Sequence, residues 1–164
     1  MGYSITQAKP SDDQEELTSL INRNFQKNDP QWFNWSQRQN PFGENLCWLA
    51  REESVGKLIG STGLLRRRVN YDGQSFAVGQ AEAINIDEAH RSAQAALKLQ
   101  RVLISHLPET DFHFVYGMTE TAAAVFKRCR YKQIGTFQHW VKPLRSEYKL
   151  KNKISNRFVR KGAT

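Results

Sequence analysis

The stretch AEAINIDEAHRSAQAALKLQ, residues 81–100, decides the fold. It begins as the end of an apolar strand, passes through a polar elbow and continues as an amphipathic helix expected over residues 91–107, with Ala96, Leu99 and Leu103 at helical spacing. A strand joined to such a helix predicts a crossover unit in a mixed sheet. Ligands of such sheets tend to bind beyond the carboxyl ends of the strands, where this elbow lies.

Hydrophobic periodicity and turn signals predict the remaining elements on both sides of this stretch. Their order, β-α-α-β-β-β-α-β-α-β, predicts an α/β (α+β) domain with a central mixed, largely antiparallel sheet. An Asp-Gly pair at 72–73 marks the hairpin between two long strands. We expect strands at 3–9, 45–52, 57–70, 75–86, 111–117 and 131–144, and helices at 11–25, between 30 and 41, at 91–107 and at 119–130.

Composition describes a globular chain with an unevenly distributed charge. Hydrophobic residues make up 39% and charged residues 24% of the 164 residues, which suits one folded domain, expected over residues 1–144. The net charge is +8, and residues 145–164 carry +6 of it, so the body carries only +2. We therefore interpret residues 145–164 as a basic C-terminal tail. We do not expect nucleic acid as a partner, although binding through this tail remains a third hypothesis.

The same composition suggests a compartment and argues against some site types. No apolar run approaches the roughly 18 residues of a membrane-spanning helix, and we expect neither a span nor an N-terminal signal peptide. Cys47 and Cys129 are the only cysteines, which is typical of a reducing compartment and predicts a cytoplasmic protein. Neither cysteine belongs to a CxxC pair and the four histidines are dispersed, so no metal site is expected.

The elbow has the features of an anion site without the usual glycines. A helix N-terminus leaves its first N–H groups without intrahelical partners and carries partial positive charge. Anions such as phosphate bind there. Arg91 adds a full charge, the backbone N–H groups from Ser92 onward would face the ligand, and the small side chains of Ala93, Ala95 and Ala96 would let a phosphate approach.

These residues resemble a motif of the GNAT (general N-acetyltransferase) superfamily. The family's elbow commonly reads V-D-P-E-Y-R-G-K-G-I-G, and this chain reads IDEAHRSAQAA over residues 86–96. Ile86, Asp87 and Arg91 match in place, and Ala96 is a permitted small residue. The order of elements resembles the family over residues 3–144. The following helix is similar in spacing to a second family motif, N-x-x-A-x-x-x-Y-x-x-x-G-F, through Ala122 and Tyr131.

The resemblance implies binding of acetyl-CoA, or of another acyl-CoA, as co-substrate. In the family the strand before the elbow hydrogen-bonds the pantetheine arm, and the helix N-terminus holds the diphosphate. The positions implied here are Ile84, Asn85 and Ile86 for the arm, and Arg91, Ser92, Ala93, Gln94, Ala95 and Ala96 for the diphosphate.

Glu82 is the candidate base for acyl transfer to an amine. The family often has a glutamate on this strand, and a carboxylate on an apolar face has its pKa raised by desolvation, toward a range useful for deprotonating an amine. The alternative is a salt bridge to Arg66 or Arg68 on the neighbouring strand. Regular alternation along the strand would put these side chains on one face: Phe76, Val78, Glu82, Ile84 and Ile86.

Tyr116 is the candidate acid. The family often uses a tyrosine on the helix after this strand, where the chain has Phe126, which has no proton to donate. Tyr116, at the end of the strand, is near enough in topology to replace it, and Tyr131 is the alternative.

The acceptor is expected to be a small-molecule amine, apolar or ring-bearing. Trp32 and Trp35 belong to the turn-rich connector at residues 28–45, and both this connector and the region of Trp140 are segments that set the acceptor in the GNAT fold. A homodimer is left open. A second hypothesis is a GNAT-fold module that binds or senses CoA without catalysis. Ser92 and Gln94 in place of glycines, and Phe126 in place of tyrosine, favour that hypothesis.

Overall fold

The computed structural model describes residues 2–8, 12–25, 35, 39–82, 84–91, 93–119, 121–138 and 140. The chain divides into two compact units, Met1–Lys132 and Gln133–Thr164. The first unit contains the sheet, its helices and every predicted site residue. The predicted basic tail at 145–164 lies outside the described residues, so the boundary expected at residue 144 stays a prediction.

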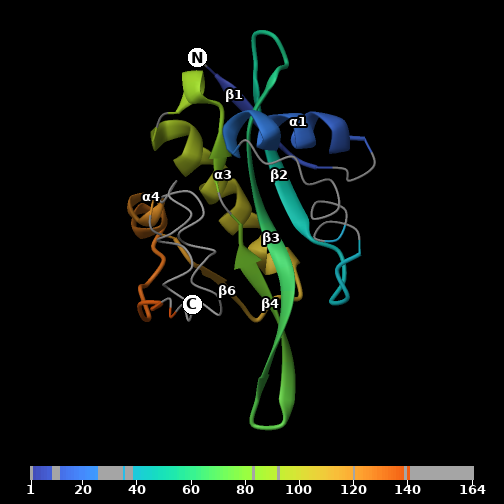
Figure 1. Ribbon diagram of the computed structural model, residues 1–164, viewed down its shortest axis with the longest axis vertical. Helices are drawn as coiled ribbons and strands as arrows, with labels where there is room; N and C mark the ends of the chain where they lie inside the picture. The colour runs from blue at the N-terminus through green and yellow to red at the C-terminus, as the bar shows by residue number, and fades with distance from the viewer. Residues whose placement is uncertain are drawn as a thin grey trace, which may run out of the picture. The chain divides into compact units, whose positions relative to one another are not determined.

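The sheet is mixed and largely antiparallel, as the sequence predicts. Its order is β1-β2-β3-β4-β6, and a further short strand, β5, pairs with β3. Only the pairing of β4 with β6 is parallel among the described strands. In Figure 1 the long hairpin of β3 and β4 runs along the vertical axis. The strands are β1 (Tyr3–Gln7), β2 (Leu46–Glu52), β3 (Leu58–Tyr71), β4 (Gln74–Ala81), β5 (Asn85–Ile86) and β6 (Phe114–Gly117).

Helices cover both faces of the sheet. Neighbouring residues of a strand point to opposite faces, and in β2 Leu49 packs in one cluster with Leu17 and Leu20 of the first helix. Trp48, on the opposite face, packs in a second cluster with Leu99. The described helices are α1 (Gln14–Phe25), α3 (Ala93–His106) and α4 (Ala123–Arg128), with one-turn 3-10 segments η1 (Glu88–His90) and η2 (Leu107–Glu109). The helix expected between residues 30 and 41 falls mostly outside the described residues.

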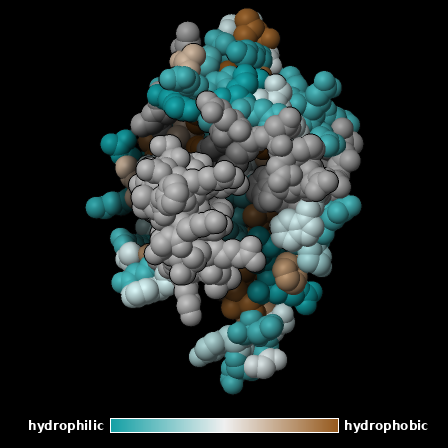
Figure 2. All heavy atoms as spheres, in the orientation of Figure 1, coloured by the Kyte–Doolittle hydropathy of each residue, from teal (hydrophilic) through white to brown (hydrophobic). Residues whose placement is uncertain are grey.

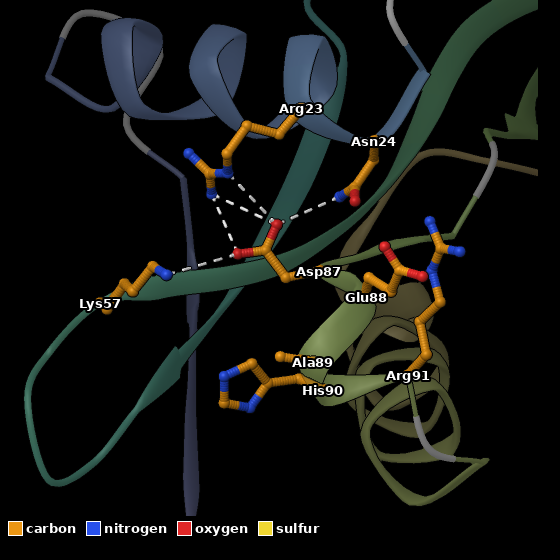
Figure 3. A pocket seen from close by; sticks show the side chains of 8 residues that line it. All are labelled: Arg23, Asn24, Lys57, Asp87, Glu88, Ala89, His90 and Arg91. Atoms are coloured by element: carbon orange, nitrogen blue, oxygen red, sulfur yellow. Dashed lines mark hydrogen bonds and ion pairs between the residues drawn. The ribbon is translucent and has the colours of Figure 1, made fainter.

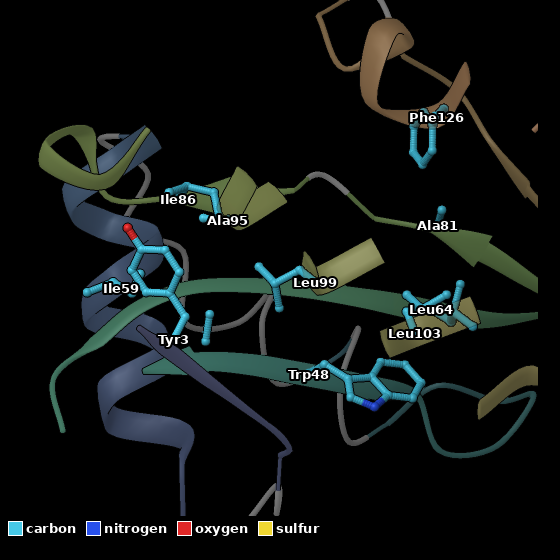
Figure 4. Packing of buried hydrophobic residues seen from close by; sticks show 11 residues of the cluster. Tyr3, Trp48, Ile59, Leu64, Ala81, Ile86, Ala95, Leu99, Leu103 and Phe126 are labelled. Atoms are coloured by element: carbon cyan, nitrogen blue, oxygen red, sulfur yellow. The ribbon is translucent and has the colours of Figure 1, made fainter. Parts of the chain in front are cut away.

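The main core lies between the sheet and α3. Figure 4 shows Leu99 and Leu103 of α3 directed at β2 and β3, and both side chains are fully buried together with Trp48. Gly60 of β3 allows this close packing: a Cβ there would lie 2.8 Å from Cδ1 of Ile86 and 3.4 Å from Cδ1 of Leu99. The missing side chain at residue 60 therefore lets β5 and α3 approach β3 together.

The strand predicted at 75–86 is interrupted, which corrects one expectation. Ala81 pairs with Leu64 and Asn85 pairs with Ser61, so the register between the two strands shifts by one residue between these two pairs. This is a β-bulge, and a bulge reverses the alternation of side chains beyond it. Ile84 and Ile86 therefore pack with the α3-side core. Glu82 points to the α1 face and does not share a face with them.

The strand predicted at 131–144 is also not found where the structure describes the chain. Residues 131–138 and 140 carry no strand. A strand gains stability from ladder hydrogen bonds and from burying one face, whereas Ile134, Phe137 and Trp140 are 94%, 73% and 89% exposed. Alternating apolar residues predicted a strand here, but these residues have neither a ladder nor a buried face in the described part.

The view in Figure 2 shows hydrophilic side chains over α1 and over the free end of the β3–β4 hairpin. The described helices include none that is long and apolar enough to cross a membrane.

Candidate functional site

The candidate site lies where the strands β4 and β6 stop pairing with each other. β4 pairs in parallel with β6 up to Ala81 and Gly117. Beyond the bulge, β5 pairs with β3. A Cβ at Gly117 would lie 3.3 Å from the ring of Phe126 and from Ala81. The aromatic ring of α4 thus packs against the last rung before the strands diverge.

The elbow that follows β5 is a compact turn. The Asp87 backbone N–H donates to the Ile59 carbonyl at 2.8 Å, which fixes the end of β5 on β3. The Arg91 backbone N–H donates to the Glu88 carbonyl at 3.2 Å, so this N–H is engaged within the turn. The Arg91 side chain folds back, and its Nε donates to the Ile86 carbonyl at 3.3 Å. Arg91 therefore keeps its guanidinium beside the end of β5.

The start of α3 differs in detail from the sequence-based expectation. Ala95 and Ala96 are 1% and 8% exposed, so their small side chains serve packing against the core. Gln94 is exposed, and its side chain is turned to solvent and away from the core. The helix begins at Ala93, and Ser92 lies outside the described residues. The helix N-terminus at the elbow retains the partial positive charge that attracts anions.

A polar hollow of about 360 Å³ lies beside the elbow (Figure 3). The Asp87 carboxylate is its centre: Arg23 of α1 approaches it at 3.1 Å and Lys57 at 3.9 Å. Asn24 donates to the same carboxylate at 3.4 Å. Asp87, matched to the family motif, therefore joins α1, the β2–β3 turn and the elbow. The hollow is lined by Arg23, Asn24, Lys57, Asp87, Glu88, Ala89, His90 and Arg91.

Asn85, predicted to bind the pantetheine arm, is 3% exposed and lies on the α1 face of β5. Its Oδ1 accepts a hydrogen bond from the Asn24 side chain at 2.7 Å. Its Nδ2 is buried and has no hydrogen-bond partner among the described residues. A buried donor of this kind costs free energy unless another group satisfies it.

Glu82 lies at the bulge, on the face toward α1. Its backbone N–H donates to the Gly63 carbonyl at 2.9 Å, and its Oε2 would be 3.2 Å from a Cβ at Gly63. The carboxylate therefore occupies the space that a side chain at residue 63 would fill, and Oε1 is buried. Burial, followed by the charge of Glu82, raises the pKa of the neighbouring Cys47 thiol to about 12. Arg66, considered above as a partner of Glu82, pairs with Asp111 at 2.6 Å.

Tyr116 lies on the same face as Glu82. It pairs with Gln80 across the parallel ladder, and its hydroxyl donates to Gln80 Oε1 at 3.4 Å. Gln80 precedes Glu82 by two residues, so their side chains share a face. Glu82 and Tyr116 are thus on one face, beside the rung where the strands diverge.

Tyr131, the alternative acid, lies on the other side of the sheet. Its ring packs on Phe126 with centroids 4.8 Å apart. Its hydroxyl is buried without a hydrogen-bond partner among the described residues. Burial, with a smaller contribution from Cys129, raises the pKa of Tyr131 to about 12. Such a hydroxyl stays protonated through neutral pH.

Comparison with known proteins identifies the fold. No family model and no curated protein matches the sequence. Solved structures do match. The glucosamine-6-phosphate N-acetyltransferase of Arabidopsis thaliana superposes with a TM-score of 0.64 at 13% identity, over 86% of this chain and 99% of its own. The chain has the GNAT fold.

Two further structures match the GNAT fold of this chain in the same way. An acetyltransferase of Trypanosoma brucei gives a TM-score of 0.66 at 14% identity, over 86% of this chain and 100% of its own. A Clostridium acetobutylicum protein described as a predicted acetyltransferase, solved with acetyl-CoA, gives 0.63 at 14% identity, over 85% of this chain and 96% of its own. All three structures are described as acetyltransferases or predicted acetyltransferases, and at 13–14% identity their likeness to this chain is one of fold.

Sequence reasoning missed the residues that connect distant elements. Arg23 and Asn24 reach partners 61 to 64 positions away, and Gln80 joins Arg67 to Tyr116. No local spacing marks these side chains. Only the strand register, together with the end of α1, brings them to the site.

Proposed function

We propose that the protein is an acyl-CoA-dependent N-acyltransferase that transfers an acetyl group from acetyl-CoA to an amine of a small molecule. The observation that carries the proposal is the end of the parallel pairing between β4 and β6 at Ala81 and Gly117, beyond which β5 pairs with β3. The side chains of Glu82 and Tyr116 lie on one face of the sheet where this pairing ends. The elbow after β5 leads to the N-terminus of α3. The GNAT fold of solved acetyltransferases, one of them with acetyl-CoA, supports the same chemistry.

The co-substrate would bind along β5 and the elbow. The pantetheine arm would run beside Ile84, Asn85 and Ile86, where the amide Nδ2 of Asn85 has no protein partner among the described residues. The diphosphate would lie at the α3 N-terminus. Arg91 would add its charge there, and Ser92, Ala93, Gln94, Ala95 and Ala96 would form the first turn facing it.

In this proposal the chain's residues move two protons during direct transfer. The bound thioester supplies the activated acetyl group. The amine nitrogen attacks the thioester carbon, so that a C–N bond forms and the C–S bond breaks. Glu82 accepts the proton that the amine releases, and Tyr116 donates a proton to the departing sulfur. Holding amine and thioester together supplies much of the acceleration.

A ligand panel tests the proposal directly. Acetyl-CoA should raise the melting temperature, and thiol release should follow on addition of a suitable amine. S-acetylpantetheine, which lacks the diphosphate, should stabilise the protein far less, because it leaves the α3 N-terminus without an anion. If no acyl-CoA shifts the melting curve at millimolar concentration, the proposal fails.

A second candidate is a GNAT-fold module that binds acyl-CoA without turning it over. The presence of Gln94 in place of a glycine and of Phe126 in place of a tyrosine favours it. The two functions separate in one experiment. A wild-type protein that binds acetyl-CoA but never releases thiol with any amine is the module.

A further inference from the structure

Arg67 of β3 lies on the face of the sheet that carries the proposed acid, Tyr116, and the proposed base, Glu82. It pairs with Val78 in the ladder, on the face that carries Gln80. Its Nε donates to Gln80 Oε1 at 3.1 Å, the same oxygen that accepts the Tyr116 hydroxyl. The guanidinium carbon lies 5.9 Å from the ring centroid of Trp35, a described residue of the connector between α1 and β2. Arg67 is therefore held in place by one neutral hydrogen bond and one aromatic ring.

The charge of Arg67 has no carboxylate partner among the described residues, in contrast to Arg23, Arg51 and Arg66; the described arginines that share this property, Arg68, Arg91, Arg101, Arg128 and Arg130, are exposed to solvent. Arg23 pairs with Asp87, Arg51 with Asp13 and Glu16, and Arg66 with Asp111. Arg67 is partly buried, and its bond to an amide oxygen does not neutralise it. A partly buried cation without a counterion lies where an anion from outside the described chain would be stabilised.

The position of this cation constrains the acceptor. Gln80 is two residues from Glu82, about 7 Å along the strand, and it also binds Tyr116. The Arg67 head group is thus linked through Gln80 to the proposed acid and lies on the face of the sheet that carries the proposed base. A free amine is protonated at neutral pH, and its positive charge would be repelled by Arg67 on this face. An acceptor that also carries an anion would meet an attraction.

We propose that Arg67 binds an anionic group of the acceptor, and that the acceptor is a small amine with a carboxylate or a phosphate a few bonds from its nitrogen. Trp35 lies over the guanidinium and limits its motion, which prepares the planar fork for an anion. This inference rests on the proposed function, because it names the acceptor class of the same site.

Two matched pairs of amines test the class. L-phenylalanine is compared with phenethylamine, and O-phosphoethanolamine with ethanolamine, so that carboxylate and phosphate are judged separately. The wild type should favour the anionic member of at least one pair in kcat/KM. Arg67→Gln should lower that preference roughly 10- to 100-fold, mainly through KM for the amine, because a charged hydrogen bond is lost. The KM for acetyl-CoA should change much less.

Arg68→Gln is the matched control. Arg68 is the next residue of the same strand, is exposed and points to the opposite face, so its substitution should leave the preference unchanged. Arg67→Lys keeps the positive charge but lacks the planar pair of guanidinium donors, so it should retain part of the preference for the anionic amine. Melting curves of all variants show whether each one folds.

Binding by calorimetry makes the result independent of turnover. The wild type should bind the favoured anionic amine more tightly than its neutral partner, and Arg67→Gln should lose the difference. Equal binding of both members of each pair by the wild type, or a preference that survives in Arg67→Gln, overturns the inference even if acetyl-CoA is turned over. Absence of acyl-CoA binding defeats the proposed function instead, and calorimetry of the amines still decides the role of Arg67.

Discussion

The side-chain amide of Asn24 in α1 donates a hydrogen bond to Oδ1 of Asn85 in β5 at 2.7 Å. The two residues are 61 positions apart, and one lies at the end of the first helix while the other lies in the strand proposed to hold the pantetheine arm. Arg23, next to Asn24, binds Asp87 at the end of the same strand. The end of α1 and the strand beyond the bulge are therefore fixed to each other by side chains.

Asn24→Ala should destabilise the protein by about 1–3 kcal/mol, because it leaves Asn85 Oδ1 buried without its donor. The proposed arm strand would also be less well held, so the Kd for acetyl-CoA should rise. Chemical denaturation and calorimetry measure the two effects. Asn70→Ala, an exposed change in the β3–β4 hairpin, is the control, and equal stabilities of the two variants would contradict the link.

Glu82→Gln should lower kcat about 10²- to 10⁴-fold if the carboxylate is the base, since that is the range of general-base contributions. The amide has nearly the same shape, so acetyl-CoA binding and folding should persist. Stopped assays of thiol release and calorimetry report the two properties. Glu44→Gln, at an exposed position, should have wild-type rates, and a fully active Glu82→Gln variant would remove Glu82 from the mechanism.

Gln94→Glu should have opposite effects on stability and on ligand binding. A negative charge in the first turn of α3 complements the helix dipole and should stabilise the protein by about 0.3–1 kcal/mol. The same charge would repel a diphosphate at that turn, so acetyl-CoA should bind more weakly, most clearly at low salt. Ser105→Glu in the last turn should instead destabilise the helix without changing binding. Unchanged acetyl-CoA affinity in Gln94→Glu would argue against a diphosphate at the elbow.

The stability of the protein should decrease with pH above about 9 in part through Cys47. Burial raises the pKa of this thiol from an ordinary value of 9.0 to about 12, so the folded state holds the proton more tightly than the unfolded state does. This contribution is complete below pH 9 and is lost as pH rises toward 12, by at most about 1.4 kcal/mol per pH unit.

Cys47→Ala should therefore have a shallower fall in unfolding free energy between pH 9 and pH 10.5 than the wild type, at the same urea concentrations. Cys129→Ala serves as the comparison, because burial also raises the pKa of the Cys129 thiol, whereas the charge of Arg101 acts to lower it. Identical slopes in the wild type and Cys47→Ala would show that the surroundings of Cys47 do not raise the pKa of its thiol.

The sequence predicts most strands and helices of the fold, because their signals are local. Alternation, helical spacing and the Asp-Gly turn are each contained in short windows. The bulge between Ala81 and Asn85 is not predictable in this way, since it is defined only by the pairing of β4 and β5 with β3. The face of Glu82 was consequently predicted wrongly relative to Ile84. The positions of Arg67 and Gln80 depend on the same register, and no motif marks them.

Gly60→Ala should destabilise the protein by about 1–3 kcal/mol through overpacking, because the new methyl would lie 2.8 Å from Cδ1 of Ile86 and 3.1 Å from the Asn85 carbonyl oxygen. Ile86→Val removes that Cδ1 atom and by itself should cost about 0.5–1.5 kcal/mol. The double variant should therefore lose less free energy of unfolding than the sum of the losses in the two single variants. Urea denaturation of all four proteins measures this as a double-mutant cycle. The contact with the Asn85 carbonyl remains, so recovery should be partial. Simple additivity would mean that β5 does not pack on Gly60 through Ile86, and the close approach of β5 to β3 at the site would have to be abandoned.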